Sequence, residues 1–147
     1  MDRLKLLVAE DSEFDLFLFK RALQRAGIAC DAYFVSDGQE AMDYFRGLDQ
    51  FADRQIYPLP DVLLLDINMP RLSGFDVLKW LKAQPSLSST PVIIFSSSQD
   101  NRDVSRAYSL GANSYMSKVT EPQRLAEMVE TFEHYWLEFN LLPYLER

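Results

Sequence analysis

Short apolar runs alternate along the chain with longer segments whose apolar residues recur at every third or fourth position. A run of about four or five apolar residues without polar alternation is typical of a strand buried on both faces of a parallel sheet. The longer segments predict amphipathic helices that cover such a sheet. The pattern predicts strands over 5–9, 29–35, 62–65, 91–95 and 114–117, and helices over 13–26, 38–46, 74–83, 100–110 and 121–140.

Polar residues at the helix ends support these boundaries. Ser12 and Gly27 are residues of the types that start and stop a helix, and they bracket the first one. Thr120 and Gln123 match a capping box at the start of the last helix. Five consecutive strand–helix units predict a doubly wound α/β fold, with a five-stranded parallel sheet between two layers of helices, in one domain over 1–147.

The connection over 48–60 is longer than the others and contains Phe51, Tyr57, Pro58 and Pro60. Long connections of this kind are usually either functional or packed on their own side chains. Its aromatic residues favour packing onto the domain, and a functional loop remains the alternative.

Polar residues whose side chains can bind ligands or take part in reactions follow four of the predicted strands. Glu10 and Asp11 follow the first, Asp66 the third, Ser96 the fourth and Lys118 the fifth. Ligands of open α/β sheets bind outside the carboxyl ends of the strands, so we expect these side chains to meet in one crevice. Three carboxylates held together repel one another unless a cation is present, and hard oxygen ligands favour Mg²⁺.

Each of these residues also has a structural interpretation. A lone aspartate or glutamate after a strand can be a turn or cap residue, and a lone lysine is usually solvated. Ser96 begins a run of three serines that could simply open the next helix. Their joint occurrence at neighbouring strand ends favours a site over these alternatives.

The composition disfavours several classes of protein. The net charge of −7 disfavours a nucleic-acid-binding surface or an anionic-membrane surface, which need clustered Lys and Arg. No apolar run is long enough to span a bilayer, and no signal peptide is evident. Cys30 is the one cysteine and fits a reducing cytoplasm, where we expect the protein to reside.

Four segments together resemble the response-regulator receiver family. They are residues 9–12, residues 65–70 with Gly74, residues 91–97 and residues 111–118, and the resemblance extends from residue 4 to about residue 139. It implies the flavodoxin-like receiver fold with strand order 2-1-3-4-5. The long loop and the Tyr135-Trp136 pair with Pro143 resemble stand-alone regulators that serve bacterial phytochromes.

The resemblance implies a role for each site residue. Asp66 is then the phosphoacceptor in a two-component phosphorelay. Asp11, Asp66 and the backbone carbonyl of Asn68 would bind Mg²⁺, and Glu10 would assist through water. Lys118 would contact the phosphoryl group.

The resemblance also implies a switch and contains one departure. Ser96 would move toward the phosphoryl group and Tyr115 would turn inward. Val119 follows Lys118 where the family usually has a proline, often after a cis bond. A cis bond before a non-proline residue costs about 2.5–4 kcal/mol, so we expect a trans bond and a differently shaped loop here.

Two helices carry more apolar residues than one buried face needs. If Leu18, Ala22 and Leu23 of the first helix face the sheet, then Leu16 and Phe17 face outward. An outward-facing apolar patch there would either dock a sensor histidine kinase or lie under the long loop. The end of the last helix suggests a homodimer contact through Tyr135, Trp136, Phe139, Leu141, Leu142 and Tyr144. His134 is expected to be a solvent-facing helical histidine.

Rival functions differ at single residues. A phosphatase with an aspartate nucleophile needs a second aspartate two residues later as general acid, and Asn68 stands there, so we expect no turnover enzyme. A flavin site would need a phosphate-binding loop rich in Gly, Ser and Thr after the first strand, which is absent. A receiver-like interaction module that takes no phosphate remains an alternative.

Overall fold

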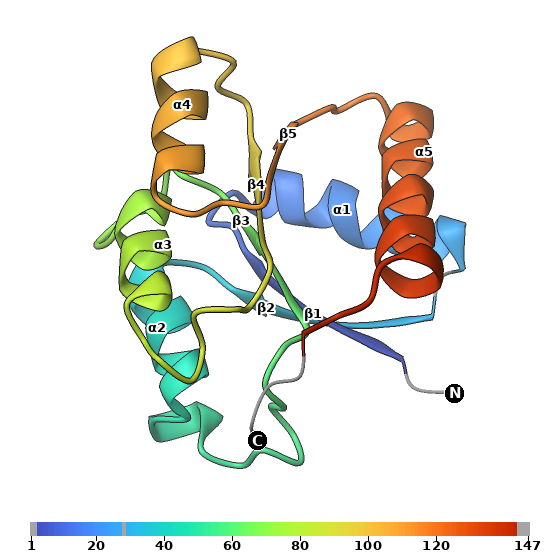
Figure 1. Cartoon of the computed structure of the whole chain (residues 1–147). Coiled ribbons are helices and arrows are strands. Elements are labelled where there is room, and N and C mark those ends of the chain that lie inside the picture. The colour runs from blue at the N-terminus through green and yellow to red at the C-terminus, as the bar shows by residue number, and fades with distance from the viewer. Residues whose placement is uncertain (1–2, 28, 144–147) are drawn as a thin grey trace.

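The computed structural model describes residues 3–27 and 29–143, and they form one parallel sheet between two layers of helices (Figure 1). The described strands pair in the order β2-β1-β3-β4-β5, which confirms the predicted fold class and strand order. They are β1 (Leu4–Ala9), β2 (Cys30–Val35), β3 (Val62–Leu65), β4 (Val92–Ser96) and β5 (Ser114–Ser117).

The α-helices follow the strands in alternation. They are α1 (Glu13–Ala26), α2 (Gly38–Arg46), α3 (Gly74–Lys82), α4 (Asn101–Ser109) and α5 (Pro122–Glu133). A short 3₁₀ helix, η1 (Asp49–Phe51), follows α2, and a π-helical segment, η2 (His134–Phe139), extends α5. None of the helices in the described part of the chain combines the length and the apolar content needed to cross a bilayer.

Successive residues of the strands face opposite helix layers. On β1, Leu7 and Ala9 pack with α2, α3 and α4, whereas Leu4, Leu6 and Val8 pack with α1 and α5. β3 is buried along its whole length, as the absence of polar alternation predicted. Each buried leucine stabilises the fold by about 1.5–3 kcal/mol, so the two apolar layers fix the sheet firmly beneath its polar edge.

The start of α5 differs from the prediction. Pro122 is the first helical residue, and the Glu121 carboxylate caps the helix by accepting hydrogen bonds from the amides of Gln123 and Arg124. The capping box predicted from Thr120 and Gln123 is therefore wrong. Proline is favoured at the first helical position because it has no N–H to satisfy, and this fixes the cap one residue later than expected.

The long connection packs its aromatic rings against α2. The ring centroids of Phe51 and Tyr57 lie 5.0 Å and 6.0 Å from that of Tyr44. The Arg54 guanidinium donates to the carbonyls of Tyr44, Phe45 and Tyr57. Because the connection precedes β3, it lies at the amino-end edge of the sheet, away from the predicted site. The interpretation that its aromatics pack onto the domain is confirmed.

The buried face of α1 was predicted only in part. Ala22 is buried as expected, but Phe19 is the other buried residue, while Leu18 and Leu23 are half-buried. Leu16, which we expected to face outward, also packs partly against the core. The apolar residues of α1 occur on more than one side of the helix, so their spacing alone could not identify the face that is buried.

The outer surface of α1 keeps two exposed aromatic side chains. Phe14 and Phe17 are 63% and 54% exposed. Of the two alternatives for this surface, cover by the long loop is wrong, because that loop packs on α2 at the opposite face of the sheet. Tyr144, assigned above to the apolar end of the last helix, lies outside the described residues.

Candidate functional site

Backbone hydrogen bonds extend the sheet into the predicted site. The amide of Glu10 donates to the Val35 carbonyl and the amide of Asp66 donates to the Ala9 carbonyl, at 3.0 and 3.1 Å. The amide of Lys118 donates to the Ser96 carbonyl at 2.8 Å. The first residue after each strand is thus still held by the ladder, which fixes where its side chain begins.

Three carboxylates gather at this edge of the sheet. Ligand oxygens of Glu10, Asp11 and Asp66 all lie within 4.8 Å of one another. Glu10 and Asp66 are only 4% and 5% exposed, whereas Asp11 is exposed. The structure therefore brings together the acidic residues that the sequence predicted.

Lys118 reaches into this acidic group from β5. Its Nζ lies 2.5 Å from Oε1 of Glu10, 2.9 Å from Oδ2 of Asp15 and 3.1 Å from Oδ2 of Asp66. The lysine side chain is 10% exposed. A lysine so nearly buried requires charged partners, which excludes the solvated alternative.

The burial of these charges changes their proton affinities. Burial raises the pKa of Glu10 to about 7, and the nearby charge of Asp66 adds to the rise, against the opposing effect of Lys118. Burial alone would lower the pKa of Lys118, but its hydrogen bonds to Glu10 and Asp15 and the charge of Asp66 outweigh that effect and raise it. The ammonium therefore stays charged at neutral pH.

Asp15 belongs to this site, although the sequence analysis missed it. It lies in the first turn of α1, where its amide donates to Oγ of the N-cap Ser12. An acidic residue there is also expected simply from its favourable interaction with the helix dipole, so its identity gave no distinctive signal. The one available signal was its spacing, one helical turn after Asp11.

The segment after Asp66 approaches the site closely. The amide of Asn68 donates to Oδ1 of Asp66 at 3.2 Å, which orients the carboxylate. Gly74 packs directly on this segment, and a Cβ at that position would lie 2.3 Å from the Asp66 carbonyl oxygen. Glycine is thus required here for space rather than for backbone freedom.

Ser96 and Tyr115 are linked through one loop. Ser96 is fully buried, and its hydroxyl accepts from the amide of Ser98 at 3.2 Å. The Tyr115 hydroxyl donates to the carbonyl of the same Ser98 at 2.8 Å. A movement of either residue would therefore be transmitted to the loop between β4 and α4.

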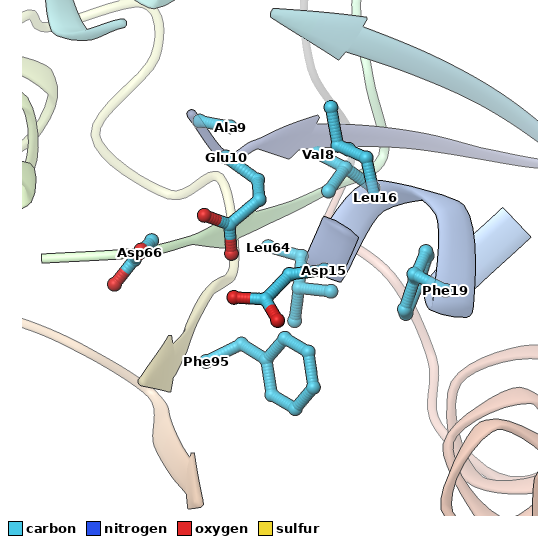
Figure 2. Close-up of a pocket in the computed structure, with 9 residues that line it drawn as sticks. All are labelled: Val8, Ala9, Glu10, Asp15, Leu16, Phe19, Leu64, Asp66 and Phe95. Atoms are coloured by element: carbon cyan, nitrogen blue, oxygen red, sulfur yellow. The ribbon is translucent and has the colours of Figure 1, made fainter. Parts of the chain in front are cut away.

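A hollow lies beside the carboxylates (Figure 2). Figure 2 shows the carboxylate side chains of Glu10, Asp15 and Asp66 grouped together, with the aromatic rings of Phe95 and Phe19 as apolar parts of the lining beyond Asp15. This apolar wall excludes water from one side of the site and strengthens the electrostatic interactions inside it.

The donor set fits a hard divalent cation. Lys118 is the one cationic residue, in the part of the chain that the structure describes, that forms a salt bridge with this acidic group. The group carries more negative charge than one ammonium neutralises, and all its side-chain ligands are oxygens. Mg²⁺ is bound in proteins by a few carboxylates with open positions for water and phosphate.

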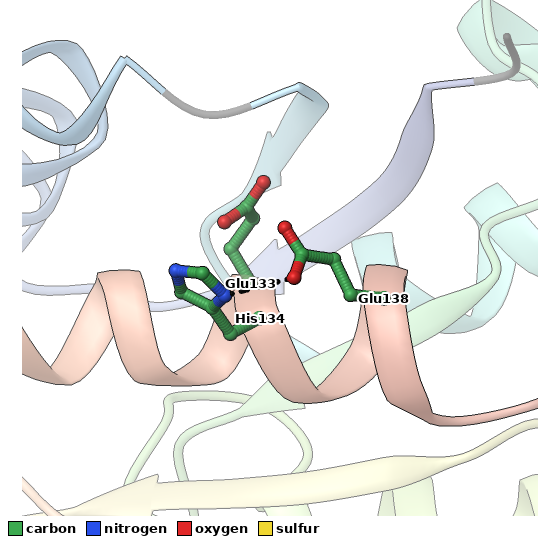
Figure 3. Close-up of side chains that lie close together, drawn as sticks. All are labelled: Glu133, His134 and Glu138. Carbon is green, nitrogen blue, oxygen red and sulfur yellow. Dashed lines mark hydrogen bonds and ion pairs between the residues drawn. The ribbon is translucent and has the colours of Figure 1, made fainter.

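A second group of ligand-type side chains lies on the C-terminal helix (Figure 3). Nδ1 of His134 lies 3.1 Å from Oε2 of Glu138, with Glu133 beside them. The His134 side chain is 58% exposed, which confirms the prediction of a solvent-facing histidine. A histidine–glutamate pair one helical turn apart stabilises an exposed helix modestly.

Comparison with known proteins agrees with the geometry. The model of the response regulator receiver domain family matches residues 6–130. Response regulator Rcp1 of Synechocystis sp. is 33% identical over 138 residues, which cover 94% of this chain and 92% of the relative. A structure of the Mn²⁺-bound form of Rcp1 has a TM-score of 0.83 at 31% identity, with 96% of this chain and 99% of that chain covered.

Two further solved structures are similar over nearly the whole chain. A response regulator in red light signalling of R. palustris has a TM-score of 0.91 at 36% identity and covers 96% of this chain and 99% of its own. The phosphorylated cyanobacterial phytochrome response regulator RcpA has a TM-score of 0.87 at 32% identity, with 97% and 99% covered. With the family model matched from β1 into α5, the chain belongs to the response regulator receiver family, and its relatives include phytochrome response regulators.

Proposed function

We propose that this protein is a response regulator of a two-component phosphorelay that accepts a phosphoryl group on Asp66. The observation that carries the proposal is the buried Asp66 carboxylate, oriented by the Asn68 amide and held 3.1 Å from the ammonium of Lys118. An aspartate placed in this way is a nucleophile beside a fixed positive charge.

The chemistry requires little beyond positioning. An oxygen of Asp66 attacks the phosphorus of a phosphohistidine, the new O–P bond forms as the P–N bond breaks, and the imidazole nitrogen leaves with the bonding electron pair. Charge develops on the three equatorial phosphoryl oxygens, where Lys118 and the Ser96 hydroxyl stabilise it. Water later hydrolyses the acyl phosphate, so the cycle is one of phosphorylation and dephosphorylation of the protein itself.

A divalent cation completes this proposal. Asp11, Asp66 and the Asn68 carbonyl would hold Mg²⁺, with Glu10 assisting through water. Bound there, the cation supplies charge neutralisation for the incoming phosphoryl oxygens. The acidic group of this chain and the Mn²⁺-bound form of Rcp1 support this assignment.

Phosphorylation would act on partner proteins by changing the conformation of a surface that they contact. Capture of the phosphoryl group draws the Ser96 hydroxyl toward Asp66, and Tyr115 follows because both residues bond to Ser98. The face formed by α4, β5 and α5 then shifts between two packings, whose populations the phosphoryl group biases.

Intact-mass measurement with Mg²⁺ and a small acyl phosphate or phosphoramidate donor tests the proposal. One hydroxylamine-sensitive phosphate is expected on the wild type, none on Asp66→Asn, and one on the matched control Asp43→Asn in α2. An unmodified wild type under every donor would favour the receiver-like interaction module. Sustained hydrolysis of an external phosphate ester would favour a phosphatase.

We propose that the phosphodonor is a sensor histidine kinase, with a bacterial phytochrome as one candidate. We propose that the transfer takes place in the cytoplasm. Phe14 and Phe17 are exposed on α1, the helix whose first turn carries Asp15, and their rings suit the apolar face of a kinase helix. Phe17→Ser is expected to slow transfer from the kinase at least tenfold without slowing transfer from a small donor. Ile56→Ser, at a 59% exposed apolar residue on the long connection, is the control.

We also propose a homodimer through the end of the C-terminal helix. Phe139 and Leu141 are 74% and 93% exposed, whereas Trp136 packs partly onto the core of its own chain. Light scattering is therefore best done with Phe139→Ser and Leu141→Ser, and both are expected to lower the molecular mass toward that of the monomer. An unchanged mass in both variants would remove this segment from the interface.

A further inference from the structure

Asp15 contacts the acidic site, but none of the roles proposed above for the site residues belongs to it. Its Oδ2 lies 2.9 Å from Nζ of Lys118, and its side chain is 25% exposed. Glu13 occupies the same first turn of α1 and has the same charge, but it is exposed. A favourable interaction with the helix dipole accounts for both acids equally, so it does not explain why Asp15 turns inward to the lysine.

Asp15 differs from the other two partners of Lys118 in one respect. Glu10 and Asp66 belong to the carboxylate group whose oxygens lie within 4.8 Å of one another and fit a cation. Asp15 contacts Lys118, but it is not a member of the carboxylate group found among the described residues. If Asp66 ligated a divalent cation and Glu10 assisted through water, Asp15 would be the one of the three partners left with the ammonium alone.

This retention matters because of the nature of lysine. An ammonium on a flexible four-carbon stem loses considerable rotamer freedom when it is held in one place. Lys118 has to stay at the rim of the site to meet the phosphoryl oxygens that arrive at Asp66. A permanent carboxylate partner keeps it there before the phosphoryl group is present, and this preorganisation accelerates the transfer.

We infer that Asp15 is a positioning residue that holds Lys118 at the acidic site while Glu10 and Asp66 are engaged by a divalent cation, and so sets the rate at which Asp66 takes a phosphoryl group. The inference rests on the proposed phosphorylation of Asp66. Asp15 acts through Lys118 and does not itself contact the reacting atoms.

The experiment compares Asp15→Asn with Glu13→Gln, which removes the same charge from the same helical turn. With saturating Mg²⁺ and a small phosphodonor, Asp15→Asn is expected to lower the rate of Asp66 phosphorylation about tenfold, the loss of one charge-assisted hydrogen bond. Glu13→Gln is expected to stay within about twofold of the wild type, as is usual for an exposed charge. Asp15→Glu, which keeps a carboxylate, is expected to recover most of the rate.

A second readout needs no phosphorylation. The two Cε protons of Lys118 are observed by NMR with Mg²⁺ bound, where a held side chain gives inequivalent signals and a free one gives a single averaged signal. Inequivalent signals are expected for the wild type and Glu13→Gln, and an averaged signal for Asp15→Asn. Since the wild type alone already reports whether Lys118 is held, an averaged wild-type signal overturns the inference even if Asp15→Asn does not fold.

The outcomes separate this inference from the proposed function. A wild type that takes no phosphate contradicts the proposed function itself. A wild type that is phosphorylated, with Asp15→Asn matching Glu13→Gln in rate and in the Lys118 signals, overturns only the role of Asp15.

Discussion

Gly74→Ala is the substitution that most directly tests how the backbone positions Asp66. Gly74 begins α3, and its amide donates to the Ile67 carbonyl at 3.0 Å. A Cβ there would lie 2.3 Å from the Asp66 carbonyl oxygen and 2.7 Å from Cα of Ile67. Ordinary van der Waals contacts begin at about 3.5 Å, so either the Asp66 segment or α3 must move by about 1 Å.

The expected magnitudes follow from that displacement. Overpacking of this kind costs about 1–3 kcal/mol in the free energy of unfolding, and the stiffer unfolded chain offsets about 0.4–1 kcal/mol of it. A shift of about 1 Å in a reacting group can slow a reaction by about 10²-fold. We therefore expect Gly74→Ala to lose about 1–2 kcal/mol of stability, yet to be phosphorylated about 10²-fold more slowly.

The control has to lose similar stability without touching Asp66. Gly27→Ala does so, because Gly27 has a φ of 62° with nothing within 4 Å of an added Cβ, and a left-handed alanine costs about 1–2 kcal/mol. Urea unfolding followed by tryptophan fluorescence gives both stabilities, and intact mass with a small phosphodonor gives both rates. If Gly74→Ala and Gly27→Ala are phosphorylated equally fast, the close approach does not position Asp66 and the reasoning fails.

Three further predictions concern single side chains. Arg54→Met removes hydrogen bonds to three carbonyls and should lower the free energy of unfolding by about 2–4 kcal/mol in urea, with phosphorylation unchanged; a loss below about 0.5 kcal/mol would contradict it. Burial raises the pKa of Cys30 to about 12. Iodoacetamide at pH 8 should therefore alkylate the folded protein at least about 10²-fold more slowly than the urea-unfolded chain. The stability linked to the protonated thiol should be present below about pH 8.5 and decline as pH rises toward 12. Equal alkylation rates would show an accessible thiolate. Tyr115→Phe removes the bond to Ser98 and should shift the NMR signals of the loop between β4 and α4 while leaving the phosphorylation rate within about twofold; unchanged loop signals would show that the hydroxyl does not couple to the loop.

The sequence predicted the strands well because burial on both faces leaves a simple record. Residues 62–65 form an uninterrupted apolar run, and β3 occupies the same residues. The strand order needed more than the pattern, since local spacing does not encode which strands are neighbours. It came from the resemblance to the receiver family, and the pairing confirms it.

Two failures show where local patterns lose their meaning. The apolar residues of α1 occur on more than one side of the helix, so their spacing could not reveal that Phe19 is buried and Leu18 only half-buried. At α5, Thr120 and Gln123 satisfy the letters of a capping box, but the proline at 122 sets the helix start and makes Glu121 the cap. At α1 the deciding constraint is tertiary packing, which spacing does not show, whereas at α5 the proline was itself a sequence signal for the first helical position.

The acidic site was predicted where residues follow strands and was missed where one comes from a helix. Glu10 and Asp66 follow apolar runs whose ends must share one edge of the sheet. Asp15 comes from the first turn of α1, and whether its side chain turns toward Lys118 depends on how that helix packs beside the sheet. Residues that join a site through helix packing are therefore the ones that a strand-end argument overlooks.

Val119 stands after Lys118 where the family usually has a proline, and other contacts hold the lysine in place. No cis peptide bond occurs among the described residues, so Val119 follows Lys118 through a trans bond, as expected. The backbone there is held by the hydrogen bond from the Lys118 amide to the Ser96 carbonyl and by the packing of Val119 on the apolar layer shared with α1 and α5. The ammonium is held independently, by carboxylates that come from the ends of β1 and β3 and from α1. Because backbone and side chain are each fixed by their own contacts, Lys118 reaches Asp66 without a proline to direct it.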